Sequence, residues 1–223
     1  MGILYIVATP IGNLEDISQR ALRILSAVDL ILCEDTRVTQ KLLNHYGIRI
    51  RTISYHQHTE IKRTEEIVRL LRDGKNLALV SDAGTPGISD PGNRLIEQLN
   101  VCFPGQLTIV PVPGPSALSA AASIAGFPMD RFVFLGFPPV KKKRKKFFEE
   151  AVNSDYPAVF YESPYRILKT LQEIDSLTPK KIVVCRELTK KFETVYRGSA
   201  KEVLAKLTKD EVRGEFVVVL GNK

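Results

Sequence analysis

Short runs of β-branched and other apolar residues recur along the whole chain, and segments with helical spacing separate them. Runs this short are typical of strands that helices cover on both faces. Their alternation with helical patterns indicates an α/β fold. We expect strands at 3–8, 30–33, 77–81, 107–112, 132–136, 158–162, 182–185 and 216–220.

Helical periodicity fills most of the intervals between these runs. Apolar residues recur on one face from Ile17 to Val28, and Asp16 with Gln19 resembles a capping box at the start of that helix. Segment 193–199 can pair antiparallel with 182–187, so we expect a mixed sheet in the second half of the chain. Further helices are expected at 36–46, 60–72, 93–99, 116–124, 142–152, 164–174 and 200–207.

A proline-rich segment interrupts the middle of the chain. Pro111, Pro113, Gly114 and Pro115 combine fixed φ angles with missing N–H donors, which makes a stiff, non-helical connector. We therefore expect two α/β domains, 1–112 and 113–223, each of a size that can fold alone. A crevice between two domains is a common ligand site.

The positive charge of the chain is concentrated in one short stretch. The formal net charge is +7, and a single run supplies six of these charges. Such a run is either the solvated first turn of a helix or a patch that meets an anionic partner such as nucleic acid. Beside the run, Phe147 or Phe148 can stack on a base, and burial in the core is favoured for at least one of them. The run consists of Lys141, Lys142, Lys143, Arg144, Lys145 and Lys146.

Cysteine, histidine and hydropathy patterns narrow the class of protein. Cys33, Cys102 and Cys185 lie far apart in apolar surroundings, so we expect reduced, buried thiols without a disulfide framework. His56 and His58 have no further ligands at metal-site spacing, so a polar strand end is favoured and no metal is expected. No apolar stretch reaches the length of a membrane span, which indicates a cytoplasmic protein without membrane association.

Loops rich in glycine and proline follow several of the predicted strands. The longest, 81–92, carries Asp82 and Asp90, and ligands of α/β folds bind at the carboxyl ends of strands. Gly87 to Gly92 has the spacing of a P-loop, but Asn93 and Arg94 stand where Lys and Ser or Thr are required. The pattern therefore disfavours a nucleotide triphosphate, and a rigid structural connection is the alternative to a ligand site. Similar turns follow at 8–13, 113–117, 161–166 and 186–190.

Taken in order, these motifs resemble a known family. They are ATPIGNLEDIS, CEDTR, SDAGTPGISDPG, VPGPSA, GFPP followed by the basic run, FYESPYRI, CREL and GEFVVVL. Together they are similar to the ribosomal RNA small subunit methyltransferase I family over nearly the whole chain. The resemblance implies the tetrapyrrole methylase fold, with two α/β domains and S-adenosylmethionine in the cleft between them.

The resemblance also implies an activity and partners. It implies a homodimer that methylates the 2′-hydroxyl of a cytidine ribose in the decoding region of 16S rRNA, within the 30S subunit. Carried over by motif, the contacts to the cofactor are expected at Pro10, Asp82, Gly84, Thr85, Ser116, Ala117, Tyr161, Leu188 and Glu215.

A ribose hydroxyl is a poor nucleophile until a base takes its proton or a cation stabilises the alkoxide. We consider Asp35 and Arg37, and Glu187 beside Arg186, as candidates for these roles. The alternative for Glu34, Asp35 and Arg37 is a structural ion-pair cluster at the start of a helix, and both readings stay open.

One departure from the family concerns the C-terminus. Many relatives continue past the GEFVVVL strand into a small helical extension, whereas this sequence ends at Lys223. RNA docking is therefore expected to depend on the core of the protein and on the basic run. The competing functions are a tetrapyrrole or protein methyltransferase of the same fold and a non-enzymatic RNA-binding protein.

Overall fold

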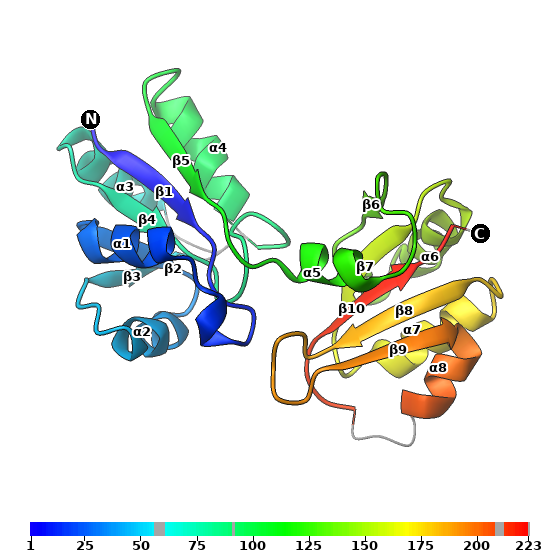
Figure 1. Ribbon diagram of the computed structural model, residues 1–223. Coiled ribbons are helices and arrows are strands. Elements are labelled where there is room, and N and C mark those ends of the chain that lie inside the picture. The colour runs from blue at the N-terminus through cyan, green and yellow to red at the C-terminus, as the bar shows by residue number, and fades with distance from the viewer. Residues whose placement is uncertain (56–60, 91, 208–211, 223) are drawn as a thin grey trace. The chain divides into compact units, whose positions relative to one another are not determined.

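Two successive α/β units make up the chain in the computed structural model, which describes residues 1–55, 61–90, 92–207 and 212–222 (Figure 1). Unit 1 is Met1–Ser116 and unit 2 is Ala117–Lys223. The sequence analysis placed the division after Val112. The proline-rich segment remains with unit 1 because the Pro115 carbonyl accepts a hydrogen bond from Thr85 Oγ1, at 3.2 Å.

Unit 1 is built on a five-stranded sheet with the order β3-β2-β4-β1-β5. All of its pairings are parallel, and its strands are covered on both faces, as the apolar runs predicted. The short strand β3 was not predicted, because three residues are too few to show a pattern. Pro111 is tolerated within β5 because β5 lies at an edge of the sheet. The strands are β1 (Ile3–Val7), β2 (Leu30–Cys33), β3 (Thr52–Ser54), β4 (Leu77–Leu79) and β5 (Thr108–Val112).

Two apolar clusters cover the two faces of this sheet. Alternation along β2 shows the division, since Leu30 and Leu32 join one cluster while Ile31 and Cys33 join the other. Helices α3 (Ile61–Arg72) and α4 (Gly92–Cys102) contribute to the first cluster, and α1 (Gln19–Ala27) and α2 (Thr36–His45) contribute to the second. Unit 1 is therefore a three-layer arrangement of helices, sheet and helices.

Two local expectations for unit 1 are wrong. The N-cap of α1 is Ser18, whose hydroxyl accepts from the Ala21 N–H, whereas Asp16 belongs to the short 3₁₀ helix η1 (Leu14–Asp16). Cys102 is exposed although Cys33 and Cys185 are buried. Leu95 and Leu99 are the buried leucines of α4, and Cys102 is the last residue of this helix.

Unit 2 contains the second five-stranded sheet, with the order β6-β7-β10-β8-β9. β6 and β7 are parallel, and the other pairings are antiparallel, so the predicted mixed sheet is confirmed. The predicted antiparallel partner of residues 182–187 is confirmed as β9. The strands are β6 (Val133–Phe134), β7 (Ala158–Glu162), β8 (Lys181–Arg186), β9 (Thr194–Ser199) and β10 (Phe216–Leu220).

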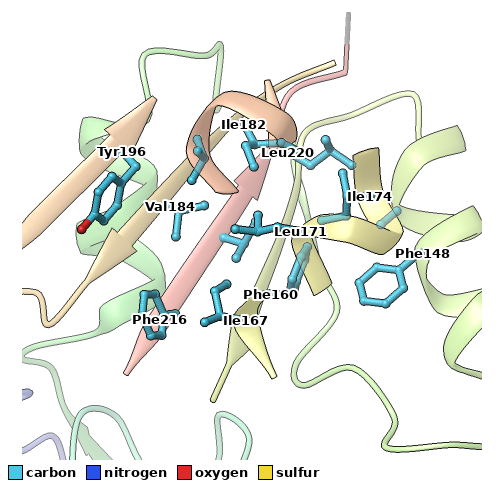
Figure 2. Close-up of a cluster of buried hydrophobic side chains, with 14 of the residues drawn as sticks. Phe148, Phe160, Ile167, Leu171, Ile174, Ile182, Val184, Tyr196, Phe216 and Leu220 are labelled. Atoms are coloured by element: carbon cyan, nitrogen blue, oxygen red, sulfur yellow. The ribbon is translucent and has the colours of Figure 1, made fainter. Parts of the chain in front are cut away.

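One face of this sheet packs on three helices, α6 (Arg144–Asn153), α7 (Ile167–Asp175) and α8 (Ala200–Leu207). Figure 2 shows the shared core, in which Phe160 of β7 and Phe216 of β10 lie among side chains of α7 such as Leu171. Helix α5 (Ala117–Ile124) packs against β7 and β10. Each helix in the described ranges is too short or too polar to cross a membrane.

Candidate active site

The loops that follow β1, β4 and β5 are tied together at the carboxyl edge of the sheet in unit 1. Thr9 and Gly84 form an isolated bridge, with N–H to carbonyl distances of 2.9 and 3.0 Å. The N–H of Ala8 donates to the Val112 carbonyl at 3.2 Å. Because parallel strands end at one edge, these bonds join three of the predicted site loops into one frame.

Small residues make this frame possible. The buried Thr9 hydroxyl donates to the Ser81 carbonyl at 3.1 Å, which fixes the start of the loop after β4. Gly84 has a φ of +82°, and a Cβ on it would lie 3.3 Å from Ile11 Cγ2. A Cβ on Gly114 would lie 3.0 Å from the Cβ of Ala8. The loops therefore approach one another more closely than larger side chains would allow.

The turn with P-loop spacing is closed by its own carboxylate. Asp90 Oδ1 accepts hydrogen bonds from the N–H groups of Gly87 and Gly92, both at 2.7 Å. Gly92 begins α4, so a carboxylate already occupies the helix N-terminus where a P-loop binds phosphate. Asn93 Nδ2 donates to the Gly87 carbonyl at 2.6 Å. These contacts hold residues 87–93 in a fixed conformation, as expected for the structural alternative to a phosphate-binding loop.

Carboxyl groups that follow β2 and β4 lie beside this turn. We call Glu34, Asp35 and Asp82 the acidic corner. Asp82 Oδ1 accepts from the Asp35 N–H at 3.1 Å, which joins the loop after β4 to the end of β2. Burial raises the pKa of the Glu34 carboxyl, and the nearby carboxylates of Asp90 and Asp82 raise it further. Desolvation also raises the pKa of Asp82, and repulsion from Asp35 adds to the increase. A cation bound here would stabilise the ionised form of both carboxyls.

Asp35 and Arg37 form an ion pair within this corner. The Arg37 guanidinium donates to both carboxylate oxygens of Asp35, with an Nη2 to Oδ2 distance of 2.6 Å. These contacts lower the pKa of Asp35 from 3.8 to about 2. Asp35 also caps α2 by accepting from the Arg37 N–H. The predicted structural cluster is present as this pair, and a carboxyl with so low a pKa is a weak base.

Glu34 is a residue that the sequence analysis did not select as a site residue. It follows directly on the fully buried strand β2, and its raised pKa makes it a stronger base than Asp35. The available signal was its position as the first charged residue after an apolar run.

The chemistry of unit 1 fits a cationic cofactor with a sulfonium group. Glu34 and Asp82 are two carboxyls with raised pKa, and glycines leave room for close approach to the backbone. Pro10 is buried beside the Thr9 bridge, and Thr85 and Ser116 flank the Pro115 carbonyl. Charge and backbone access both suit S-adenosylmethionine better than a phosphate chain.

In unit 2, the predicted residues Glu187, Leu188 and Glu215 are brought together. Lys190 Nζ lies 2.8 Å from Glu187 Oε1 and 3.0 Å from Glu215 Oε2. Burial raises the pKa of Glu187, but hydrogen bonds from Lys190 and from the Glu215 N–H outweigh it, so this pKa is lowered. Leu188 is buried in the same loop. Glu187 is therefore an ionised structural partner of Lys190 and a weak base.

The two other predicted cofactor residues of unit 2 lie on separate elements. Tyr161 of β7 is half-buried, with its ring centroid 5.0 Å from that of Phe134 and 5.4 Å from that of Phe137. Burial raises the pKa of its hydroxyl. Ala117 is the first residue of α5 and is half-buried.

The basic run is divided by the structure. Arg144 is buried, and its guanidinium donates to Glu173 Oε2 at 2.8 Å and to Thr170 Oγ1 at 2.6 Å. It is therefore part of the core rather than an RNA contact, because burial within an ion-pair network withdraws it from solvent. Phe148 is buried and Phe147 is half-buried against the same core, which confirms the expected burial of at least one of the two rings. The lysines remain exposed at Lys141, Lys142, Lys143, Lys145 and Lys146.

The described residues contain no group of three His, Cys, Asp or Glu side chains placed to hold a metal ion. His56 and His58 lie outside the described residues.

The chain matches one protein family and is similar in sequence to several proteins of a single name. Residues 3–204 match the family described as Tetrapyrrole (Corrin/Porphyrin) Methylases. The chain is 44% identical to the ribosomal RNA small subunit methyltransferase I of Thermotoga maritima, over all of both chains. It is 45% identical to the protein of that name from Escherichia coli O157:H7, over 98% of this chain and 77% of the relative. The family therefore includes proteins of about the length of this chain and longer ones.

Solved structures show the same fold at low identity. The methyltransferase CobJ superposes with a TM-score of 0.71 at 20% identity, covering 100% of this chain and 95% of that protein. A diphthine synthase superposes with a TM-score of 0.74 at 15% identity, covering 99% and 90%. The predicted tetrapyrrole methylase fold is confirmed. The chain belongs to the tetrapyrrole methylase family and, within it, to the ribosomal RNA small subunit methyltransferase I family.

Proposed function

We propose that the protein transfers a methyl group from S-adenosylmethionine to the 2′-hydroxyl of a cytidine ribose in the decoding region of 16S rRNA, within the 30S subunit. The observation that carries this proposal is the identity of 44% to a ribosomal RNA small subunit methyltransferase I over the full length of both chains. Such a substrate places the protein in the cytoplasm. We also infer a homodimer, which sedimentation analysis of the purified chain tests.

The cofactor is assigned to the carboxyl edge of unit 1. Pro10, Asp82, Gly84, Thr85 and Ser116 belong to the loops that the Thr9 bridge and the Pro115 carbonyl hold together. The acidic corner supports this assignment, because a sulfonium and an amine are both cationic. Contacts from Ala117, Tyr161, Leu188 and Glu215 remain predictions from the resemblance.

When bound, S-adenosylmethionine supplies an electrophilic methyl group. The task of the protein is then to hold the ribose oxygen in line, an effect of positioning that can contribute roughly 7–11 kcal/mol. We assign the stabilisation of the developing alkoxide to Arg37, which is 86% exposed and is held in one orientation by Asp35. Because the pKa of Asp35 is about 2, this orienting charge persists throughout the neutral range.

Acceptance of the hydroxyl proton is assigned to Glu34 in preference to Asp35 or Glu187. The pKa of Glu34 is raised, whereas those of Asp35 and Glu187 are lowered by ion pairs with Arg37 and Lys190. A base with a pKa nearer to neutrality is typically worth 10²–10⁴-fold in rate. Glu34→Gln is therefore expected to lower kcat with little change in cofactor affinity.

The test uses labelled S-adenosylmethionine and 30S subunits that lack the modification. We expect label in 16S rRNA at one cytidine whose 3′ phosphodiester resists alkaline hydrolysis, since a 2′-O-methyl group blocks that cleavage. Asp82→Asn should lower incorporation when the cofactor is below saturation. Asp73→Asn, which changes an exposed residue of unit 1 next to Gly74, should leave incorporation unchanged. Label in a ribosomal protein or on a base would contradict the proposal, as would wild-type protein that transfers no methyl group to 30S subunits.

A further inference from the structure

Exposed aromatic side chains gather at the carboxyl ends of β6 and β7. Tyr165 is 96% exposed in the turn after β7, and Phe137 is 49% exposed in the segment after β6. Because β6 and β7 are parallel neighbours, both turns lie at the same edge of the sheet. Val140 and the first three lysines of the basic run follow Phe137. We call Phe137, Val140, Lys141, Lys142, Lys143 and Tyr165 the stacking edge.

Arg166 fixes the Tyr165 turn against the Phe137 segment. Its Nη1 donates to the Pro138 carbonyl at 2.8 Å, and its Nη2 lies 2.8 Å from Glu162 Oε1. Its Nε donates to Ser163 Oγ at 3.1 Å. One side chain therefore connects the two turns through three contacts.

Arg144 fixes the same segment from the other side. Its Nη1 donates to the Pro139 carbonyl at 3.1 Å, and its Nη2 lies 3.6 Å from Glu162 Oε2. The Glu162 carboxylate is wholly buried and also accepts from Thr170 Oγ1 at 2.6 Å. Glu162 thus anchors two arginines that hold consecutive proline carbonyls, and the lysines beyond them project from a rigid base.

The charges on this edge are available to a polyanion. Lys145 pairs with Glu149, but within the described part of the chain no ion pair involves Lys141, Lys142 or Lys143. All three are exposed. An anionic partner would lower the repulsion among them.

We propose that the stacking edge binds an unpaired stretch of RNA, with Tyr165 stacked on a nucleobase and Lys141 to Lys143 facing the adjoining phosphates. This inference rests on the proposed function and names the form of RNA that the protein recognises. Stacked duplexes present no free base faces, whereas unpaired bases stack on exposed aromatic side chains. Exposed aromatic rings with neighbouring lysines are the combination of side chains that recognises single strands.

The first experiment compares Tyr165→Leu and Tyr165→Phe for binding to a single-stranded RNA oligonucleotide from the decoding region. Tyr165→Leu should weaken binding at least fivefold, which corresponds to about 1 kcal/mol of lost stacking. Tyr165→Phe should bind as the wild type does. The matched control is Tyr156→Leu, since Tyr156 is 39% exposed and precedes the opposite end of β7.

An abasic series separates stacking from other effects. Replacing the stacked nucleotide by an abasic one should weaken binding of the wild type, and Tyr165→Leu should then cause no further loss. A general disturbance of the surface would weaken binding to both RNAs equally and would overturn the proposal. A duplex of the same sequence should bind at least fivefold more weakly than the single strand.

The lysines are tested through salt dependence. Lys141→Gln with Lys142→Gln should reduce the slope of log affinity against log salt by about 1.4, because each phosphate contact to a single strand contributes about 0.7. The control pair, Lys181→Gln with Lys201→Gln, removes the same charge from exposed positions outside the stacking edge and should leave the slope unchanged.

The outcomes distinguish this inference from the proposed function. If wild-type protein methylates 30S subunits and Tyr165→Leu changes neither RNA affinity nor the abasic comparison, the inference is overturned while the proposed function stands. If the wild type transfers no methyl group but shows the Tyr165 effect, the proposed function fails and the inference stands. Loss of binding to phosphatidylglycerol vesicles in Tyr165→Leu, with RNA affinity unchanged, would assign the edge to membranes and overturn the inference.

Discussion

The carboxyl edge of the parallel sheet in unit 1 and the edge at the carboxyl ends of β6 and β7 in unit 2 are built by different means. In unit 1, backbone bonds between Thr9 and Gly84 and glycines with little space around them hold the loops together. In unit 2, a buried carboxylate, Glu162, anchors Arg144 and Arg166, which hold the neighbouring turns. Backbone ties leave the side chains of unit 1 available for a ligand, whereas unit 2 uses charged side chains as structure.

The charges exposed at the two edges are also opposite. Two carboxyls with raised pKa, Glu34 and Asp82, lie at the edge of unit 1. The stacking edge of unit 2 carries Lys141 to Lys143, for which the described residues show no ion pair. The comparison teaches that one fold class provides a corner for a cation in one sheet and a platform for a polyanion in the other. Function follows from the loops and not from the sheets.

The largest expected effect is on stability and concerns the buried network of Arg144 and Glu162 in unit 2. Arg144→Met removes one partner of the buried network and leaves Glu162 and Thr170 incompletely bonded, so the free energy of unfolding should fall by about 3–5 kcal/mol. Urea denaturation followed by circular dichroism measures it. Lys142→Met, two residues before it in the same run, should change this free energy by less than about 0.5 kcal/mol. An equal loss of stability in the two variants would contradict the assignment of Arg144 to the core and Lys142 to the surface.

The next effect tests the acidic corner of unit 1. Asp82→Asn removes a carboxylate whose charge favours a cationic ligand, so the Kd for S-adenosylmethionine should rise about tenfold, or about 1.4 kcal/mol. Isothermal titration calorimetry checks it, with Asp73→Asn as the control. Affinity that stays at the wild-type level in both variants would place the cofactor away from this corner.

An effect of similar size concerns the glycines of unit 1. Gly84→Ala and Gly105→Ala both place a side chain at positive φ, of +82° and +68°, so each should lower the free energy of unfolding by about 1–2 kcal/mol. Gly105 has no atom within 4 Å of an added Cβ. Only Gly84→Ala should also weaken cofactor binding in calorimetry. A similar loss of affinity in both variants would show that strain, rather than the loop frame, is responsible.

The smallest effect concerns the exposed ion pair of unit 1. Because the pKa of Asp35 is lowered from 3.8 to about 2, the stability from its pairing with Arg37 is present above about pH 4 and is lost as the pH falls through about 2. Titration of the carboxyl by NMR should give a pKa near 2 in the wild type. Arg37→Met should return it toward 3.8, and an unchanged value would show that Arg37 is not the cause.

Much of the fold was predictable from the local pattern of residues. The run at 30–33 is apolar throughout because both faces of β2 are buried, and this pattern alone predicted a strand. The resemblance of the loop motifs predicted the family, which the comparisons confirm. The cap of α1 was assigned to Asp16 in place of Ser18, because both residues are good caps and only the path of the chain separates them.

Arg144 and Glu34 show what the pattern could not decide. Arg144 stands in sequence among five lysines and differs from them only because Glu162, Thr170 and Glu173 surround it in the fold. Glu34 and Asp35 are adjacent carboxyls, yet burial raises the pKa of the first, and an arginine lowers that of the second.

The amino-acid sequence by itself determined the order of strands and helices along the chain, the family and the position of the loops. These features depend on residues close together in the sequence, because apolar runs and turn residues act locally. Tertiary structure alone decided which charged side chains are buried partners and which are exposed. The reason is physical: the cost of a charge depends on the dielectric and the partners around it, and residues distant in the sequence supply both.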